Sequence, residues 1–413
     1  MKVVLFEDRD FVNLLPLVYF RPVWELRVGA VTLQEKICRL LGSDCCFTAR
    51  TYLTNYYLTP EKCILDWDER EDYLLINGRW VMDDTDLQPL NALKNGQALA
   101  TEKKVLAFRG NGKSVRNCFL PDLNMVDSEI VLKKFQPVSH KATFIRYPWD
   151  AIELNGEEIT RDFKRWANPG GISGRIEEGV HVLEKDRVMV APTARIYPGV
   201  VIDATHGPVW IDDGATVMAN AVLEGPLYIG QKSIIKIGAK IYENTSIGAV
   251  CKIGGEVEES IILDYSNKQH EGFLGHAYLG SWVNLGADTN NSDLKNNYGT
   301  VTVLVNGKPV RTGLQFVGLM MGDHSKCAIN TMFNTGTVVG VNCNIFGAGM
   351  PPKFVPSFSW GGAEGLTAYQ FEKALEVAGA VMARRQVAFT DKTAQLFRAV
   401  RDLAKTIEKG TLL

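Results

Sequence analysis

The sequence lacks a strong net charge, paired cysteine motifs and long apolar runs. Its 45 basic and 47 acidic side chains leave a formal net charge of -2, which argues against nucleic acid or an anionic membrane as partner. Its 8 cysteines form no C-x-x-C pair and no Cys/His set with metal-ligand spacing. We therefore predict reduced thiols, a cytoplasmic protein and no metal site. No apolar run approaches the roughly 18 residues that span a bilayer, and acidic residues come too early for a signal peptide.

A period of six dominates the second half of the chain. A helix repeats every 3.6 residues and a strand every two, so neither explains this period. It predicts a coil of short strands in which one side chain per hexad points inward and stacked turns bury one another. The repeating positions are Val190, Ile196 and Ile202; Ile211, Val217, Leu223, Ile229, Ile235, Ile241, Ile247 and Ile253; Phe273, Leu279 and Leu285; and Met321, Cys327, Phe333, Val339 and Ile345.

These hexads resemble those of the hexapeptide-repeat acyltransferases. The resemblance implies a left-handed parallel β-helix and assembly as a homotrimer. General chirality rules favour the opposite hand for parallel crossovers, so the left hand is expected from the resemblance alone.

Residues 268–289 resemble one segment of the acetyltransferase domain in bifunctional sugar-1-phosphate nucleotidylyltransferases, with the pattern K-x-G-H-x-x-Y followed by V-N-x-G-A. The match implies that His270 is the catalytic base, that Lys268 contacts the substrate and that Asn284 belongs to the catalytic set. Gly286 and Ala287 continue the match and are expected to flank the acetyl-CoA co-substrate.

Three further positions are expected to bind the sugar substrate. Phe273 stands where the family has tyrosine, which removes one hydroxyl contact. Lys240 lies near the family's upstream phosphate-binding arginine, and Lys295 resembles the basic residue of an N-L-R element in the archaeal-type enzymes. A family lysine is replaced by Glu258-Glu259, so the acceptor can differ from glucosamine 1-phosphate.

Histidine suits acyl transfer to an amine because a protonated amine cannot attack a thioester. An imidazole with a pKa near 6.5 can remove that proton and accelerate the reaction by about 10²–10⁴. His276 is the rival base, while His206 and His324 are interpreted as loop or subunit-contact residues. A backbone N–H or an amide would stabilise the oxyanion.

Residues 1–165 resemble the nucleotidylyltransferase domain of the same enzymes, an α/β fold. The family's glycine-rich phosphate loop is absent, because residues 7–13 read EDRDFVN. The family's lysine is replaced by Val23 and its metal-binding aspartate by Arg79. Two interpretations stay open: a structural module, or nucleotidyl transfer by other residues. In the second case Arg9, Arg21 and Arg27 would bind nucleotide, Asp8 would assist, and Mg²⁺ would be required.

The expected organisation is an α/β domain (1–165), a linker (166–188), a β-helix (189–362) and a helical tail (363–413). Residues 290–316 interrupt the hexads and contain a hairpin pattern around Asn306-Gly307. Apolar residues at three-to-four residue spacing predict two tail helices that pack on the coil or on a neighbouring subunit.

The preferred hypothesis is acetyl-CoA-dependent N-acetylation of an amino-sugar 1-phosphate in sugar-nucleotide biosynthesis. Under this hypothesis the N-terminal domain can add a coupled nucleotidyl transfer. A second hypothesis is a sugar-1-phosphate nucleotidylyltransferase whose β-helix only oligomerises. A third is a non-catalytic sugar-nucleotide-binding scaffold. The expected partners are a small sugar phosphate and acyl-CoA.

Overall fold

The N-terminal domain is built on one mixed six-stranded sheet. The computed structural model describes residues 1–413 except 65, 102, 103, 121, 122 and 409–413. The strand order is β2-β1-β3-β5-β4-β6, and β5 runs antiparallel to both of its neighbours. The strands are β1 (Lys2–Phe6), β2 (Cys46–Thr48), β3 (Asp72–Asn77), β4 (Gln97–Thr101), β5 (Lys104–Asn111) and β6 (Gln136–Ser139). The helices are α1 (Leu33–Leu41), α2 (Thr51–Tyr56), α3 (Asp84–Asn91), α4 (Gly112–Arg116), α5 (Ser128–Lys134) and α6 (Pro148–Trp166). Short 3₁₀ helices are η1 (Arg9–Leu14), η2 (Val23–Glu25), η3 (Pro60–Lys62) and, further along the chain, η4 (Lys185–Arg187).

The second domain is a left-handed parallel β-helix with three faces, which confirms the predicted fold class. The first face contains β7 (Arg175–Ile176), β10 (Arg195–Ile196), β13 (Thr216–Val217), β16 (Ile234–Ile235), β19 (Lys252–Ile253), β22 (Asn267–Lys268), β29 (Lys326–Cys327), β32 (Asn344–Ile345) and β34 (Ser359–Gly362). The second contains β8 (His181–Leu183), β11 (Val201–Asp203), β14 (Val222–Glu224), β17 (Lys240–Ile241), β20 (Glu256–Glu258), β23 (Phe273–Gly275), β25 (Asn290–Asn291) and β30 (Met332–Phe333). The third contains β9 (Val188–Val190), β12 (Val209–Ile211), β15 (Leu227–Ile229), β18 (Thr245–Ile247), β21 (Ile261–Ile262), β24 (Tyr278–Leu279), β28 (Met320–Met321), β31 (Val338–Val339) and β33 (Phe354–Val355).

The chain turns at three corners of the coil. We call the turn from the first to the second face the first corner, that from the second to the third the second corner, and that from the third to the first the third corner. Parallel strands in register stack equivalent residues of successive turns into columns. The inner columns are aliphatic and fully buried, as at Ile196, Val217 and Ile235.

Two details of the predicted coil were wrong. The β-helix begins before residue 189, because β7 and β8 already pair with β10 and β11. Ile176 and Val182 are the inward residues of this first turn, which shortens the predicted linker of 166–188. Phe273 is not an inward residue; Leu274 takes that place and is buried. The next inward residue, Leu279, follows after five positions, because the second corner at His276 is one residue shorter than a hexad requires.

The predicted hairpin and the two tail helices are present. β26 (Thr302–Val305) and β27 (Lys308–Arg311) pair antiparallel across Asn306-Gly307. β35 (Gly365–Ala368) pairs with β34, so the first residues of the predicted tail are strand. α7 (Phe371–Ala383) and α8 (Asp391–Glu408) follow. α8 packs on the same chain: Glu408 accepts hydrogen bonds from the Ser357 N–H (2.8 Å) and from Tyr19 Oη (3.2 Å).

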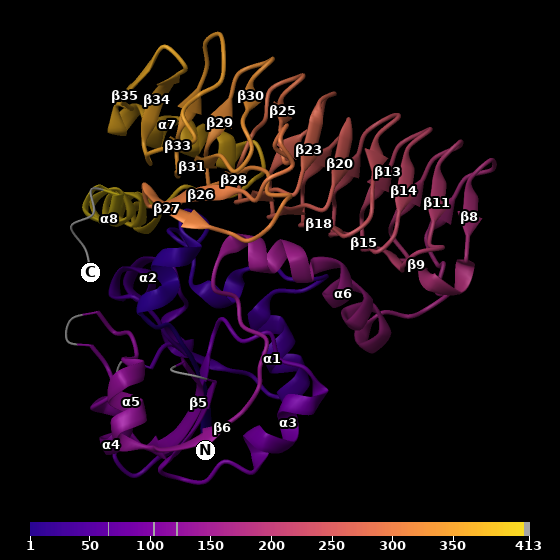
Figure 1. Ribbon diagram of the computed structural model, residues 1–413. Coiled ribbons are helices and arrows are strands. Elements are labelled where there is room, and N and C mark those ends of the chain that lie inside the picture. Colours follow the sequence, from indigo (N-terminus) through magenta and orange to yellow (C-terminus); the bar gives the residue numbers. More distant parts are fainter. Residues whose placement is uncertain (65, 102–103, 121–122, 409–413) are drawn as a thin grey trace.

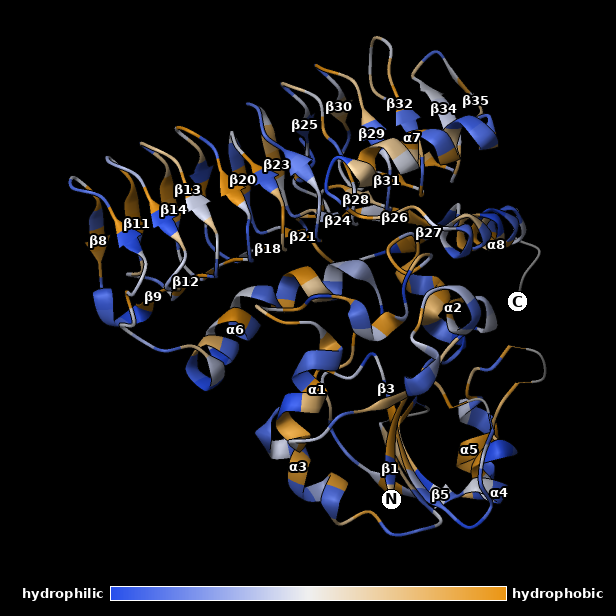
Figure 2. Ribbon diagram, turned by 180° about the vertical axis from the view of Figure 1, so that it is seen from behind, coloured by the Kyte–Doolittle hydropathy of each residue, from blue (hydrophilic) through white to orange (hydrophobic). Residues whose placement is uncertain are grey.

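The N-terminal domain packs against the third face, and α6 lies along the coil (Figures 1 and 2). Asn155 of α6 donates to the Asn244 carbonyl at 2.7 Å, and Tyr278 Oη donates to the Arg27 carbonyl at 2.9 Å. Gly156 lies inside α6, where glycine normally costs about 1 kcal/mol relative to alanine. A Cβ there would lie 1.7 Å from Asn244 Oδ1, so the close approach to the coil requires glycine.

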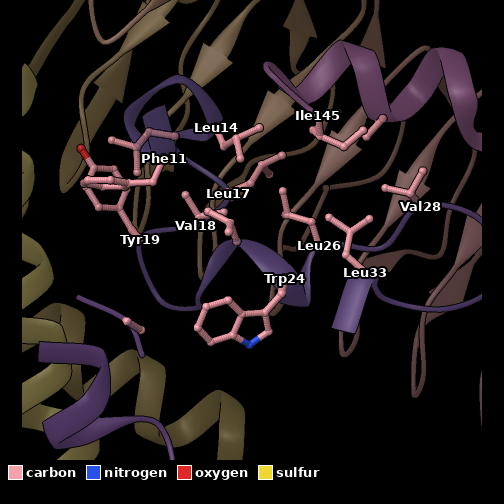
Figure 3. Close-up of a cluster of buried hydrophobic side chains, with 14 of the residues drawn as sticks. Phe11, Leu14, Leu17, Val18, Tyr19, Trp24, Leu26, Val28, Leu33 and Ile145 are labelled. Atoms are coloured by element: carbon pink, nitrogen blue, oxygen red, sulfur yellow. The ribbon is translucent and has the colours of Figure 1, made fainter. Parts of the chain in front are cut away.

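One continuous apolar core joins the two domains and α8. Its N-terminal part, drawn in Figure 3, includes Trp24, Leu26 and Ile145. The same cluster contains Tyr278 of the coil and Phe397 of α8. Among the described residues, no helix combines the length and the apolar character that crossing a bilayer would need.

Lys36 of α1 is fully buried between two carboxylates of α6, and we expect this triad to be essential for stability. Its ammonium lies 2.6 Å from Glu158 Oε2 and also pairs with Asp162. Lys36→Met removes the cation beside the buried Asp162, while Glu158 keeps its pair with Arg161, and should lower the free energy of unfolding by about 3–5 kcal/mol in urea titrations. Arg39→Met removes an exposed pair on the same helix and should cost at most about 0.5 kcal/mol. Equal losses in the two variants would contradict this account.

Candidate functional site

The first corner around His270 rests on a buried lysine. Lys268 stacks on Ile253 in an inner column that is otherwise apolar, and its side chain is only 1% exposed. Its ammonium bends toward the corner and donates to the carbonyls of Gly254 (2.9 Å) and His270 (3.0 Å). Burial lowers the pKa of Lys268 to about 8. Lys268 is therefore beneath the proposed base, and it holds the peptide group of His270 rather than lining a surface.

His270 itself lies exposed at the tip of this corner. Within the described part of the chain, its imidazole forms no hydrogen bond and no ion pair. Lys240 begins β17 on the adjoining second face, and its half-exposed ammonium lies 3.9 Å from Glu271 Oε2. Along that face Lys240 pairs with Glu256, which pairs in turn with Phe273. The structure thus brings four predicted residues, Lys240, Lys268, His270 and Phe273, to the first corner.

The remaining residues of the motif lie one turn further along the coil. Asn284 is on the first face, bridged to Asn267 on one side and to Lys326 on the other. A Cβ on Gly286 would lie 2.4 Å from the Ala328 carbonyl carbon, so the next turn requires glycine there. The carbonyl of Ala287 accepts the Asn330 N–H at 2.7 Å. The contacts of Gly286 and Ala287 are therefore packing contacts between turns.

Lys295 is separate from the first corner. It lies on the excursion 292–316, which leaves the coil at the second corner, and its ammonium donates to the Thr300 carbonyl at 2.5 Å. The pKa of Lys353 is lowered, first by burial and second by the nearby positive charge of Lys295. Lys295 and Lys353 therefore form a second basic region.

The second corner contains a histidine–carboxylate pair that the motif did not identify as the site. His276 Nδ1 lies 2.8 Å from Asp293 Oδ2, and the two side chains are 14% and 12% exposed. Burial lowers the pKa of His276, but the hydrogen bond and charge of Asp293 more than offset it, so the net shift is upward. The imidazole stacks on Phe316 at a centroid distance of 5.0 Å. The sequence signal that could have found this pair is the recurrence of polar residues at the same corner of successive turns, here Glu258, His276 and Asp293.

The three arginines proposed to bind nucleotide do not come together. Arg9 is 54% exposed, pairs with Asp127 and lines a cavity of about 590 Å³ in the N-terminal domain. Arg21 and Arg27 line a different cavity of about 570 Å³ between this domain, the third corner and α8. Arg21 pairs there with Asp323 of the coil. These two arginines therefore join the domains.

Buried ion pairs occupy the end of β1, where the family has its phosphate loop. Glu7 is fully buried and accepts two hydrogen bonds of 3.0 Å from the Arg50 guanidinium. Asp8 accepts from Arg79 Nη2 at 2.6 Å. Asp10 also pairs with Arg79, and its pKa is lowered because Lys104 and Arg79 outweigh the raising effect of burial. Mg²⁺ needs free oxygen ligands, and these carboxylates are already neutralised, so they do not fit that ion.

The buried ammonium of Lys268 predicts a pH-dependent stability. Below pH 8 the folded chain bears the full cost of the buried charge, at most about 3 kcal/mol for this pKa difference. Between pH 8 and 10.5 the folded state releases the proton while the unfolded state retains it, so wild type should gain stability relative to Lys268→Met. Urea titrations over this range measure the gain. Lys392→Met, at an exposed position of α8, should show none, and a flat difference for Lys268→Met would contradict the assignment.

Comparison with known proteins finds similarity to sugar nucleotidyl transferases over part of the chain. Residues 3–168 match the model of a family described as sugar nucleotidyl transferase. A bifunctional sugar-1-phosphate nucleotidylyltransferase/acetyltransferase of Sulfurisphaera tokodaii is 31% identical over 203 residues, which cover 48% of this chain and 43% of that protein. The bifunctional protein GlmU of Methanococcus maripaludis is 27% identical over 200 residues, 48% of this chain and 41% of that protein.

The chain thus spans about two fifths of the length of the curated relatives that it matches. Among solved structures, an Arabidopsis UDP-N-acetylglucosamine acyltransferase matches 51% of this chain and 79% of its own, with 13% identity and a TM-score of 0.21. Residues 3–168 thus match the sugar nucleotidyl transferase model, and about half of the chain is similar in sequence to the bifunctional nucleotidylyltransferase/acetyltransferases.

Proposed function

We propose that the β-helix transfers an acyl group from acyl-CoA to the amine of an amino-sugar 1-phosphate, with His270 as the base. The observation that carries this proposal is the polar break in the inner column at the first corner. Lysine is the costliest kind of residue to place inside the coil, and it stands at the one turn that holds the matching histidine. Local choices that oppose stability are expected at functional sites.

The chemistry follows from the exposed imidazole. His270 takes a proton from the sugar ammonium, and the freed amine attacks the thioester carbonyl. The tetrahedral intermediate then collapses, the amide forms and the CoA thiolate leaves, taking up a proton. Asn284 is the proposed donor to the oxyanion, and Gly286 and Ala287 are proposed to flank the donor.

Basic side chains supply the proposed phosphate contacts. The half-exposed Lys240 at the same corner is proposed to hold the sugar phosphate, next to Phe273. Lys295 is proposed to bind a phosphate of acyl-CoA together with Lys353. Because Lys268 is buried, its proposed role changes from binding substrate to positioning the His270 backbone.

A second copy of the chain is the proposed neighbour at this corner. Three large apolar side chains are exposed along the first corner: Ile237 (62%), Ile329 (67%) and Phe346 (39%). Exposed apolar rows of this kind mark protein contacts, and a homotrimer would cover them while closing the site around His270.

Substitution of His270 tests the proposal. Free-thiol release from acetyl-CoA, with glucosamine 1-phosphate and other amino sugars as acceptors, should fall by about 10²-fold or more in His270→Ala. His181→Ala, at another exposed histidine of the coil, should retain turnover. Loss in His276→Ala with full activity in His270→Ala would move the base to the second corner. No turnover with any acceptor, from folded wild-type protein, would reject acyl transfer.

Nucleotidyl transfer is the second candidate, favoured by the family match of residues 3–168. The ion pairs at the end of β1 oppose it. We expect uridine triphosphate with Mg²⁺ to leave the melting temperature unchanged, whereas a ligand at about 100 times its Kd would add about 2.7 kcal/mol. A clear shift, together with pyrophosphate release from a sugar 1-phosphate, would instead establish an active N-terminal site. If neither acetyl-CoA nor uridine triphosphate gives turnover or a shift in melting temperature, the chain would be a non-catalytic scaffold.

A further inference from the structure

The second corner stacks three potential metal ligands from successive turns. Glu258 ends β20, His276 follows β23 and Asp293 follows β25. One ligand atom from each lies within 4.8 Å of the others. The three residues come from successive turns at one corner, so the stacking of turns creates the cluster. In the sequence the three residues are 18 and 17 positions apart, far from any short metal-binding motif.

The charges at this corner are unbalanced. Glu258 and Glu259 of the coil and Glu153 of α6 all interact electrostatically with His276. In the described part of the chain none of these three glutamates forms an ion pair with lysine or arginine. Together with Asp293 they place four carboxyl groups around one imidazole. A bound cation would supply the missing positive charge.

The ligand set indicates which cation fits. An imidazole nitrogen and two carboxylate oxygens suit first-row divalent metals, whereas Mg²⁺ and Ca²⁺ prefer oxygen alone. His276 Nδ1 and Asp293 Oδ2 already face each other at 2.8 Å, so an ion bound between them would replace the shared proton.

The cluster lies at the neck of the excursion 292–316. Asp293 is its second residue, and Phe316, stacked on His276, ends it. The Gly318 N–H donates to the His276 carbonyl at 2.8 Å, and the Val317 N–H donates to the Asp293 carbonyl at 2.9 Å. An ion here would tie both ends of the excursion to the coil and fix the segment that contains Lys295.

We propose that Glu258, His276 and Asp293 form a binding site for one divalent zinc-class cation that clamps the excursion to the β-helix. The site is distinct from the first corner, and it does not depend on the proposed acyl transfer. Its role is structural: the ion holds the neck of the excursion closed.

Metal titration of the full chain tests the site. After treatment with EDTA and gel filtration, the protein should bind one equivalent of Zn²⁺, more weakly Mn²⁺, and Mg²⁺ least. Zn²⁺ should raise the melting temperature and slow amide hydrogen exchange in 292–316. His276→Gln, Asp293→Asn and Glu258→Gln should each weaken Zn²⁺ binding by at least about tenfold. Glu258→Gln leaves the His276–Asp293 hydrogen bond intact, so it reports on the site even if the other variants misfold.

Two matched variants control for unrelated sites. Asp288→Asn and His181→Gln change exposed residues of the same types on the coil and should leave Zn²⁺ binding unchanged. The proposal is overturned if the stripped protein binds no Zn²⁺ at micromolar concentrations. It is equally overturned if the equivalent persists in both His276→Gln and Glu258→Gln, or if bound Zn²⁺ leaves exchange in 292–316 unaltered.

Discussion

The interior of the coil has room for about one side chain per strand, and the rest of the molecule depends on that constraint. Filling it with Ile, Val and Leu at every sixth position holds successive turns in parallel register. Register then stacks the corners as well as the faces. Residues some 17 positions apart become neighbours, as His276 and Asp293 do. The candidate functional residues therefore lie in columns along the corners of the coil, where side chains do not have to fill the aliphatic interior.

Much of the fold could be predicted because hexads are a local signal. The prediction of the inward residues fails where the number of residues in a corner varies. Ile176 and Val182 continue the hexads backward, but polar residues separate them from the recognised run, so the first turn was assigned to a linker. A corner one residue short put Leu274, not Phe273, inside. The same uncertainty of register hid the inward place of Lys268, which only the paired strands reveal.

The candidate site was predictable only in part, for a related reason. The motif brought His270, Lys268 and Phe273 to one corner, because they lie within six positions of one another. It could not show that the Lys268 ammonium is beneath His270, since that follows from three-dimensional register. Arg9, Arg21 and Arg27 are the residues predicted to bind nucleotide if the N-terminal domain is active. Docking of the domain on the coil separates them, because Asp323, more than 300 positions from Arg21, draws that arginine to the junction.

The N-terminal domain has a structural role whatever its chemistry. Its core is continuous with Tyr278 of the third face and Phe397 of α8, so much of the apolar surface of each part is buried by the others. Ion pairs such as Glu7–Arg50 lie beneath the loops that reach this junction, since Arg50 also donates to the Arg21 carbonyl. A nucleotide loop at the end of β1 would require these groups to be free and hydrated. The residues that would have to be free for a phosphate site are therefore the ones that support the junction with the coil. In this chain they are paired and buried in that supporting role.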